Sequence, residues 1–161
     1  MARGTPATAA LDKARLAYRL HEYDYDPEAA KIGLAAAESL GVAAGRMFKT
    51  LMAQVETAKG AEIVCALLPS DAEMSLKKLA AAAGGKSAAM LKPELAEKTT
   101  GYHVGGISPL GQRKRARVFA DLSLTDFETV FVNGGRRGLQ IEIAPAALVE
   151  LLGATVVNLH A

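Results

Sequence analysis

The chain has 161 residues, of which 50% are hydrophobic and 22% charged, and its formal net charge is +2. This length fits one globular domain with a proper core and leaves no room for two sizeable domains. The high apolar fraction and the small net charge exclude a disordered chain. No apolar run approaches the roughly 18 residues that a membrane-spanning helix needs, which excludes a membrane protein. We therefore treat residues 1–161 as a single domain.

The cysteine content and the first residues both favour a cytoplasmic protein. Cys65 is the single cysteine, so no internal disulfide can form. It lies in the apolar run 63–68, where a small buried thiol is the expected state. Residues 1–6 contain a positive charge but no apolar signal core after it. The small positive charge permits nucleic-acid binding without requiring it.

Three elements are predicted in the first quarter of the chain. Thr5 as N-cap and Pro6 in the first turn predict a helix that runs toward Arg19. Residues 18–25 alternate aromatic and polar side chains, which is typical of a strand. Residues 29–40 predict a second helix that ends at the following glycine.

The middle of the chain predicts a hairpin followed by shorter elements. Residues 48–55 and 62–68 are two strand candidates on either side of a short turn. Residues 75–83 predict a helix with a serine N-cap and a glycine end. A brief strand over 87–91 and a helix after Pro93 follow.

The last third begins with a loop and ends in alternating strands and helices. Residues 101–111 hold four glycines and a proline, which predicts a long loop. Beyond it, strands are expected over residues 118–122, 129–132, 139–143 and 155–159. A tight turn over residues 133–138 precedes the third of these strands, and a helix over residues 145–152 precedes the last. This irregular order, with at least two hairpins, predicts an α+β fold with a mixed or mainly antiparallel sheet.

The motifs of common enzyme classes are absent from the sequence. It contains no Gly-x-Ser-x-Gly elbow, Walker loop, Rossmann fingerprint or His-Glu-x-x-His motif. The histidines His21, His103 and His160 have no ligand-like spacing to one another or to Cys65, so no metal site is expected. The acidic residues between 24 and 28 (Asp24, Asp26 and Glu28) favour a solvated turn over a catalytic pair.

Three other features could carry chemistry. The glycine-rich segments 105–110 and 134–138 could present backbone N–H groups to a carboxylate, a phosphate or a developing oxyanion, or could simply be turns. Lys49 begins an apolar strand, where a lysine is usually exposed because an unpaired buried ammonium is costly. The basic run 113–117 could contact RNA phosphates or form a solvated edge.

Taken together, these motifs resemble a known family. Residues 49–51, 100–102, 105–112 and 134–139 are similar, in the same order, to the YbaK/EbsC family, and the similarity extends from residue 21 to the last helix. Members are free-standing aminoacyl-tRNA deacylases related to the editing domain of prolyl-tRNA synthetase. The resemblance implies an α+β fold in which helices surround a curved, partly barrel-like mixed β-sheet, and it implies no cofactor.

The resemblance also implies a set of site residues. Lys49 would be the catalytic residue, at the rim of a pocket between the two glycine loops. The substrate-binding positions would be Tyr23, Ile32, Thr50, Gly105, Gly106, Ile107, Ser108, Pro109, Asn133, Gly134, Gly135 and Arg137, and the tRNA contacts Arg113, Lys114 and Arg115. The chain departs from the YbaK branch at three positions: Asn133 replaces a common Ser, Gln140 a common Asp, and Ile32 a frequent aromatic residue.

The activity implied by this resemblance is trans-editing that protects translation fidelity, by deacylation of Cys-tRNA(Pro). The substrate's own thiol would attack its carbonyl, backbone amides of residues 105–107 would stabilise that carbonyl, and Lys49 would hold the terminal phosphate or sugar oxygens. The partners would be aminoacylated tRNA(Pro) and prolyl-tRNA synthetase, with no role for DNA or membranes and with a weak homodimer left open. Two alternatives remain: a deacylase for another small mischarged residue, such as Ala-tRNA(Pro), and a non-catalytic module that binds tRNA or the synthetase.

Overall fold

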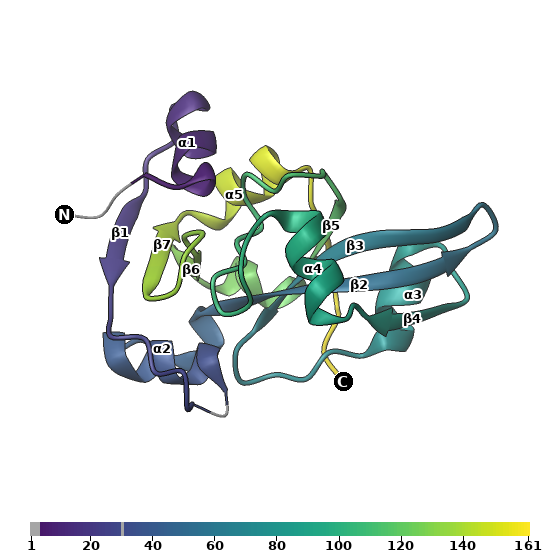
Figure 1. Cartoon of the computed structure of the whole chain (residues 1–161), viewed down its shortest axis with the longest axis horizontal. Coiled ribbons are helices and arrows are strands. Elements are labelled where there is room, and N and C mark those ends of the chain that lie inside the picture. The colour runs from purple at the N-terminus through teal and green to yellow at the C-terminus, as the bar shows by residue number, and fades with distance from the viewer. Residues whose placement is uncertain (1–3, 30) are drawn as a thin grey trace.

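The computed structural model describes residues 4–29 and 31–161 and has an α+β fold (Figure 1). Outside the described residues lie residues 1–3 and residue 30. The first three belong to the N-terminal segment considered above, and residue 30 belongs to the predicted second helix. The helices are α1 (Pro6–Lys13), α2 (Ile32–Leu40), α3 (Leu76–Ala83), α4 (Pro93–Thr100) and α5 (Pro145–Leu152), with short 3₁₀ helices η1 (Ala44–Arg46) and η2 (Leu122–Asp126). The strands are β1 (Arg19–Glu22), β2 (Phe48–Thr57), β3 (Gly60–Pro69), β4 (Ser87–Met90), β5 (Arg117–Asp121), β6 (Val130–Asn133), β7 (Leu139–Ile143) and β8 (Thr155–Val157).

The strands form two sheets. One is antiparallel, in the order β1-β7-β6, and the other is mixed, in the order β4-β2-β3-β5-β8. In the mixed sheet β4, β2 and β3 are antiparallel, whereas β5 and β8 add in parallel. Figure 1 shows the small sheet beside α1 at one end of the molecule and the β2–β3 hairpin reaching to the other end. The α+β prediction is confirmed, and the strands are divided between two curled sheets.

The two sheets meet at the beginning of β2. Met47, just before β2, forms an isolated parallel bridge with Phe131 of β6. On the same side of β2, β4 pairs only from Ala53 onward. Between these two points, residues 48–52 have β3 on one side and no strand of the described chain on the other. This open edge is the feature of the fold that makes room for the site.

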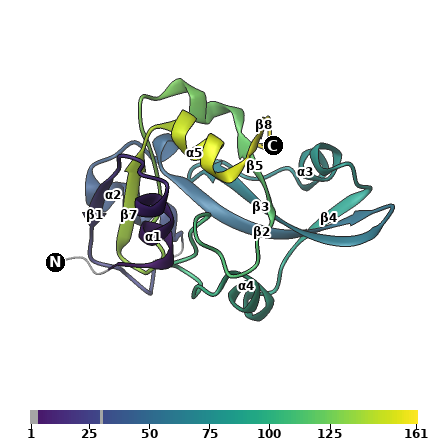
Figure 2. The same ribbon diagram turned by 90° about the horizontal axis from the view of Figure 1, so that it is seen from above.

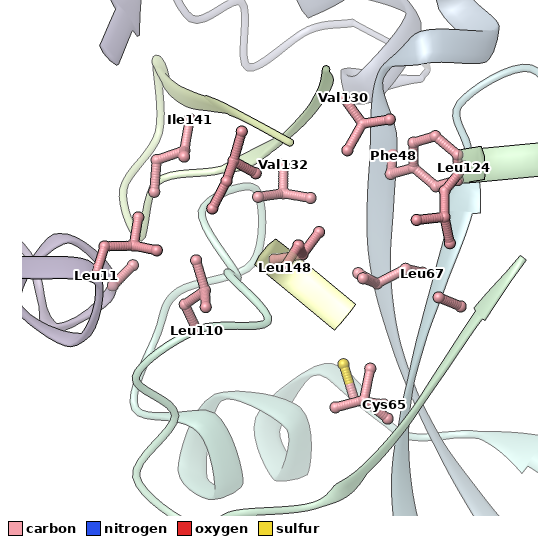
Figure 3. Packing of buried hydrophobic residues seen from close by; sticks show 14 of the residues in the cluster. Leu11, Phe48, Cys65, Leu67, Leu110, Leu124, Val130, Val132, Ile141 and Leu148 are labelled. Atoms are coloured by element: carbon pink, nitrogen blue, oxygen red, sulfur yellow. The ribbon is translucent and has the colours of Figure 1, made fainter. Parts of the chain in front are cut away.

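The main hydrophobic core fills the space between the sheets. Figure 3 shows side chains from α1, both sheets and α5 in this cluster, including Leu11, Phe48, Leu67, Ile141 and Leu148. On the opposite face of the mixed sheet, a second cluster lies under α3 and includes Val64, Ala66 and Leu68 of β3. Figure 2 shows α4 on one side of the β2–β3 ribbon and α3 on the other. Since β3 is buried on both faces, its sequence is a continuous apolar run without alternation.

Most helix ends lie at the positions that local sequence signals predicted. Gly41 and Gly84 end their helices in the left-handed conformation, as expected. The helix from Pro6 is shorter than predicted: α1 ends at Lys13, because Arg15 adopts the left-handed conformation with a φ of 57°. No glycine signals this end, so the sequence pattern missed it.

Two further expectations can be compared with the described chain. The strand predicted over residues 18–25 is shorter in the structure, where β1 covers Arg19–Glu22, because β7 pairs with only these four residues. The described residues include no helix that is both long and apolar enough to cross a membrane.

Candidate functional site

A cavity of about 340 Å³ opens along the free edge of β2. Its lining combines residues 47–52 of β2 and its approach, the start of α2, the end of β4, α4, the first glycine loop, and the facing ends of β6 and β7. Because this part of β2 is an edge, both Lys49 and Thr50 reach the cavity although they are neighbours in a strand. The lining is mostly apolar, with few polar groups, as in most small-molecule sites.

Lys49 supplies the positive charge of this cavity. Its Nζ donates a 2.7 Å hydrogen bond to the carbonyl of Ala72, in the loop after β3. Burial and the nearby Lys31 lower the pKa of Lys49, while Glu73 and Asp71 oppose this shift. The ammonium group is thus half-buried, held by one carbonyl, and positioned next to the cavity.

Buried polar atoms without a protein partner gather beside the cavity. Within the described chain, the Thr50 hydroxyl, Gln140 Oε1 and the Tyr23 hydroxyl have no hydrogen-bond partner. Thr50 and Gln140 line the cavity, and Gln140 is only 5% exposed. Burial raises the pKa of Tyr23, although the neighbouring Gln140 and Gly138 oppose this shift, so its phenol stays protonated and can donate. Unpaired buried polar groups are costly, and a bound ligand could satisfy those that face the cavity.

The two glycine loops contact each other directly. A Cβ on Gly106 would lie 2.8 Å from the peptide atoms that join Arg136 and Arg137, so glycine is required for this approach. Asn133 bridges the loops: its Nδ2 donates to the carbonyl of Gly105 (3.2 Å), and its Oδ1 accepts from the N–H of Gly135 (2.7 Å). The glycines therefore let the loops pack against each other, so the expected pocket between them is not formed, and only the first loop lines the cavity.

The structure brings together part of the predicted substrate-binding set. The residues that line the cavity are Ile32, Lys49, Thr50, Gly105, Ile107 and Asn133. The remaining positions lie outside this lining: Tyr23, Gly106, Ser108, Pro109, Gly134, Gly135 and Arg137. Ser108 is fully buried, and its hydroxyl accepts from the N–H of Leu110, which shapes the loop. The structure thus divides the predicted positions into those that line the cavity and those that lie outside its lining.

The predicted tRNA-contacting run does not form one patch. The side chain of Arg113 lies over Gly101, whereas Arg115 lies near Gly153 at the end of α5. Arg117 pairs with Glu62 through two hydrogen bonds of 2.7 and 2.8 Å. The run crosses from a loop into β5, and this path sends successive side chains to different surfaces.

Sequence reasoning missed the apolar half of the cavity. This half consists of Met47, Phe48, Leu51, Met52, Met90, Leu91, Pro93, Ala96 and Val104, and the polar Ser70 of the lining was missed as well. Tyr25 was also missed: its hydroxyl would lie 2.8 Å from a Cβ on Gly105, and the guanidinium of Arg137 lies 5.3 Å above its ring. No pattern in the sequence marks these residues, since each is an ordinary strand, helix or turn residue locally.

The cavity lining contains no histidine, cysteine, aspartate or glutamate from the described chain. Cys65 is fully buried in the main core, and burial raises the pKa of its thiol to about 12. Among the described residues, no three His, Cys, Asp or Glu side chains form a group that could hold a metal ion. The protein groups available to a ligand are therefore an ammonium, hydroxyls, amides and backbone.

Comparison with known proteins identifies the family of this chain. The sequence model of the aminoacyl-tRNA editing domain matches residues 26–151. The chain belongs to the aminoacyl-tRNA editing domain family. It is 35% identical over 147 residues to EbsC of Enterococcus faecalis, covering 91% of this chain and 87% of that protein. EbsC carries the provisional name of Cys-tRNA(Pro)/Cys-tRNA(Cys) deacylase. The family membership predicted from the motifs is confirmed.

Two further relatives place the domain in a wider context. A segment of 81 residues, half of this chain, is 32% identical to 14% of the proline–tRNA ligase of Brachyspira hyodysenteriae. The fold matches a crystal structure described as a provisional trans-editing enzyme for prolyl-tRNA synthetase, with a TM-score of 0.81, 24% identity, and coverage of 99% of both chains. The fold of an editing domain is therefore present over nearly the whole chain.

Proposed function

We propose that this member of the editing family hydrolyses the ester of Cys-tRNA(Pro) in trans, and that Lys49 is required for the reaction. The name of EbsC supports the substrate class, and the partial match to a proline–tRNA ligase supports prolyl-tRNA synthetase as the enzyme whose errors are corrected. We therefore propose two partners, the aminoacylated tRNA(Pro) and prolyl-tRNA synthetase.

The observation that carries this proposal is the chemistry of the cavity lining. From the residues that the structure describes, it offers a cation, hydroxyls and amides but no histidine or carboxylate that could act as a general base. A protein hydroxyl such as that of Ser70 is also engaged, because it donates to the carbonyl of Met47. A site of this kind suits a substrate that brings its own nucleophile and needs positioning and charge stabilisation from the protein.

The cysteinyl ester brings that nucleophile. Its sulfur attacks its own carbonyl carbon and forms a C–S bond, the C–O bond to the ribose breaks, and the thiol proton ends on the departing ribose oxygen. Water then opens the cyclic thioester and releases free cysteine. In this proposal the backbone amides of Gly105 and Ile107 stabilise the carbonyl oxygen, and the Lys49 ammonium holds ribose or phosphate oxygens. The N–H of Gly106 does not take part, because it donates to the carbonyl of His103 (2.8 Å).

The experiment compares hydrolysis of Cys-tRNA(Pro) and Ala-tRNA(Pro) by the wild-type protein and by Lys49→Ala. We expect rapid loss of the cysteinyl ester, at least 10²-fold slower in Lys49→Ala, as is found when one stabilising group is removed. Lys59→Ala is the matched control, because Lys59 lies in the exposed β2–β3 turn, outside the cavity.

Each alternative has its own signature in this experiment. Consumption of Ala-tRNA(Pro) alone would overturn the thiol-assisted reaction and assign the site to another small acyl group. If neither ester is consumed, even with prolyl-tRNA synthetase present, the chain is a binding module and the catalytic proposal is wrong.

A further inference from the structure

A second cavity lies on the other side of the glycine loops. Its volume is about 420 Å³, and it is lined by Pro6, Gly101, Tyr102, His103, Gly106, Gly135, Arg136 and Arg137. Gly105 lines the first cavity and Gly106 the second, so a single peptide unit separates them. A ligand that fills the first cavity and continues over this peptide would enter the second.

Within the described chain, the lining of the second cavity contains two arginines and no acidic residue, and the carboxylate of Glu97 lies 3.6 Å from Nδ1 of the lining residue His103. Arg136 has one distant ion pair, with Glu22 at 3.8 Å, and both side chains are substantially exposed. Arg137 uses Nε to donate to the carbonyl of Val104 (3.0 Å), and within residues 4–29 and 31–161 its terminal nitrogens have no protein acceptor. Arg113 adds a third guanidinium beside Gly101, at the edge of the cavity. These groups are arranged to accept an anion.

The other way out of the first cavity has a less favourable charge. Near Lys49, the ammonium of Lys31 and the exposed carboxylates of Asp71 and Glu73 lie close enough to act on its charge, so two carboxylates offset the two ammonium groups there. A polyanion that leaves the first cavity on that side would meet both carboxylates. The path past Gly105 and Gly106 leads instead to the arginines that line the second cavity.

The second cavity also offers surfaces on which a base can stack. The imidazole of His103 is 86% exposed, and RNA-binding proteins commonly stack unpaired bases on histidine rings or arginine guanidinium planes. The hydroxyl of Tyr102, by contrast, donates to the carbonyl of Leu110 (2.6 Å), so this ring is a fixed part of the wall.

We propose that the second cavity binds the nucleotide that precedes the aminoacylated terminal nucleoside of an RNA 3′ end. This inference rests on the proposed function, because it assumes that the first cavity receives the terminal aminoacyl nucleoside. Arg136 and Arg113 contact the phosphodiester, and His103 stacks on the base. The peptide between Gly105 and Gly106 lies under the linkage between the two nucleosides.

The first test is binding, which needs no hydrolysis. The probes are adenosine and the dinucleoside monophosphate CpA, which has the sequence of a tRNA 3′ terminus and carries the phosphodiester. We expect CpA, but not adenosine, to shift the backbone amide resonances of His103, Gly106 and Gly135 in the wild-type protein. Arg136→Glu should weaken CpA binding at least 10-fold and reduce the dependence of log K on log salt by about 0.7, the value for one phosphate contact on a single strand.

The matched control is Lys77→Glu, which makes the same charge change on an exposed residue of α3, outside both cavities. Arg113→Glu is a second variant with its own prediction, a loss of CpA affinity of similar size. The thermal midpoint of each variant should match the wild type, since the substituted side chains are exposed or half-exposed.

The second test is kinetic. For Arg136→Glu we expect at least a 10-fold loss of kcat/KM on Cys-tRNA(Pro), and less than a twofold change on the cysteinyl ester of adenosine, which lacks the preceding nucleotide. An equal loss on both substrates, or no loss on either, overturns the second cavity as a nucleotide site.

The two proposals can fail separately. If neither ester is hydrolysed but CpA shifts the amides of the second cavity, the proposed function is wrong and the nucleotide site stands. If Cys-tRNA(Pro) is hydrolysed but the shifts from CpA are confined to the first cavity, the nucleotide site is wrong and the function stands.

Discussion

Replacing Gly106 with alanine tests whether contact between the two glycine loops supports the site. The added Cβ would lie 2.8 Å from the carbonyl carbon of Arg136 and from the backbone nitrogen of Arg137. Ordinary contacts of a Cβ begin at 3.4 Å, so the loops must separate by about 0.6 Å, the difference between these distances. Both neighbours are backbone atoms, and no side-chain rotation can relieve the overlap.

The separation has a cost in stability and a cost in activity. Overpacking of this kind costs about 1–3 kcal/mol. For a domain of this size, each kcal/mol lowers Tm by about 2–4 °C, which gives a decrease of roughly 2–12 °C. A misplacement of 1 Å in an active site can reduce rates by about 10²-fold, so a shift of Gly105 and Ile107 by about half that distance should reduce kcat/KM by roughly 10-fold.

The assay measures Tm by circular dichroism and kcat/KM on Cys-tRNA(Pro) for Gly106→Ala and for Gly45→Ala. Gly45 lies in η1, and its added Cβ would meet only Asp71 carboxylate oxygens at 3.7 and 3.8 Å, which are ordinary contacts. We expect this control to behave like the wild type. A Gly106→Ala protein with unchanged Tm and unchanged kcat/KM would refute the claim that direct backbone contact between the loops holds the site.

Two further predictions concern groups outside the cavity. Iodoacetamide at pH 8 should not modify Cys65 in the folded protein, because the thiol is fully buried and burial raises its pKa to about 12; modification at the rate of a free thiol would contradict this. Asp121→Asn should lower the free energy of unfolding at pH 7 by about 1.5–3 kcal/mol, since the buried carboxylate accepts charge-assisted hydrogen bonds from Ser123, Leu159 and His160. Burial opposes ionisation of Asp121, but these hydrogen bonds hold the pKa of its carboxyl in the folded protein below the usual value. The carboxylate therefore stabilises the folded protein fully above about pH 4, and this stabilisation is lost as the pH falls through the folded pKa. Urea unfolding between pH 3 and 7 should therefore show the difference between the two proteins narrowing in acid, and a constant difference would contradict the assignment.

Most of the secondary structure follows from short-range signals in the sequence. Pro6 and Ser75 lie at helix beginnings, and Gly41 and Gly84 at helix ends, because capping and left-handed conformations depend on a few adjacent residues. The end of α1 was missed because Arg15, a residue without local preference for the left-handed conformation, adopts it there.

The family could also be recognised from the sequence alone, because its motifs occur in the same order along the chain and this order is visible without a structure. In the structure, Lys49, Thr50 and Gly105 of these motifs line one cavity. The motifs could not distinguish Gly105, which lines that cavity, from Gly106, which packs against the other loop and lines a second one.

The tertiary structure alone decided where the cavities lie. The first exists because β4 stops pairing with β2 at Ala53 and β6 meets the chain only at Met47, so an edge is left open between them. That edge depends on pairings between residues 31 or more positions apart in the chain, such as Glu56 with Ser87 and Met47 with Phe131, and a pattern of adjacent residues does not encode such a register. For the same reason, residues 113–117 read as one basic run in the sequence, whereas in the fold Arg113 lies beside the second cavity and Arg117 is paired with Glu62.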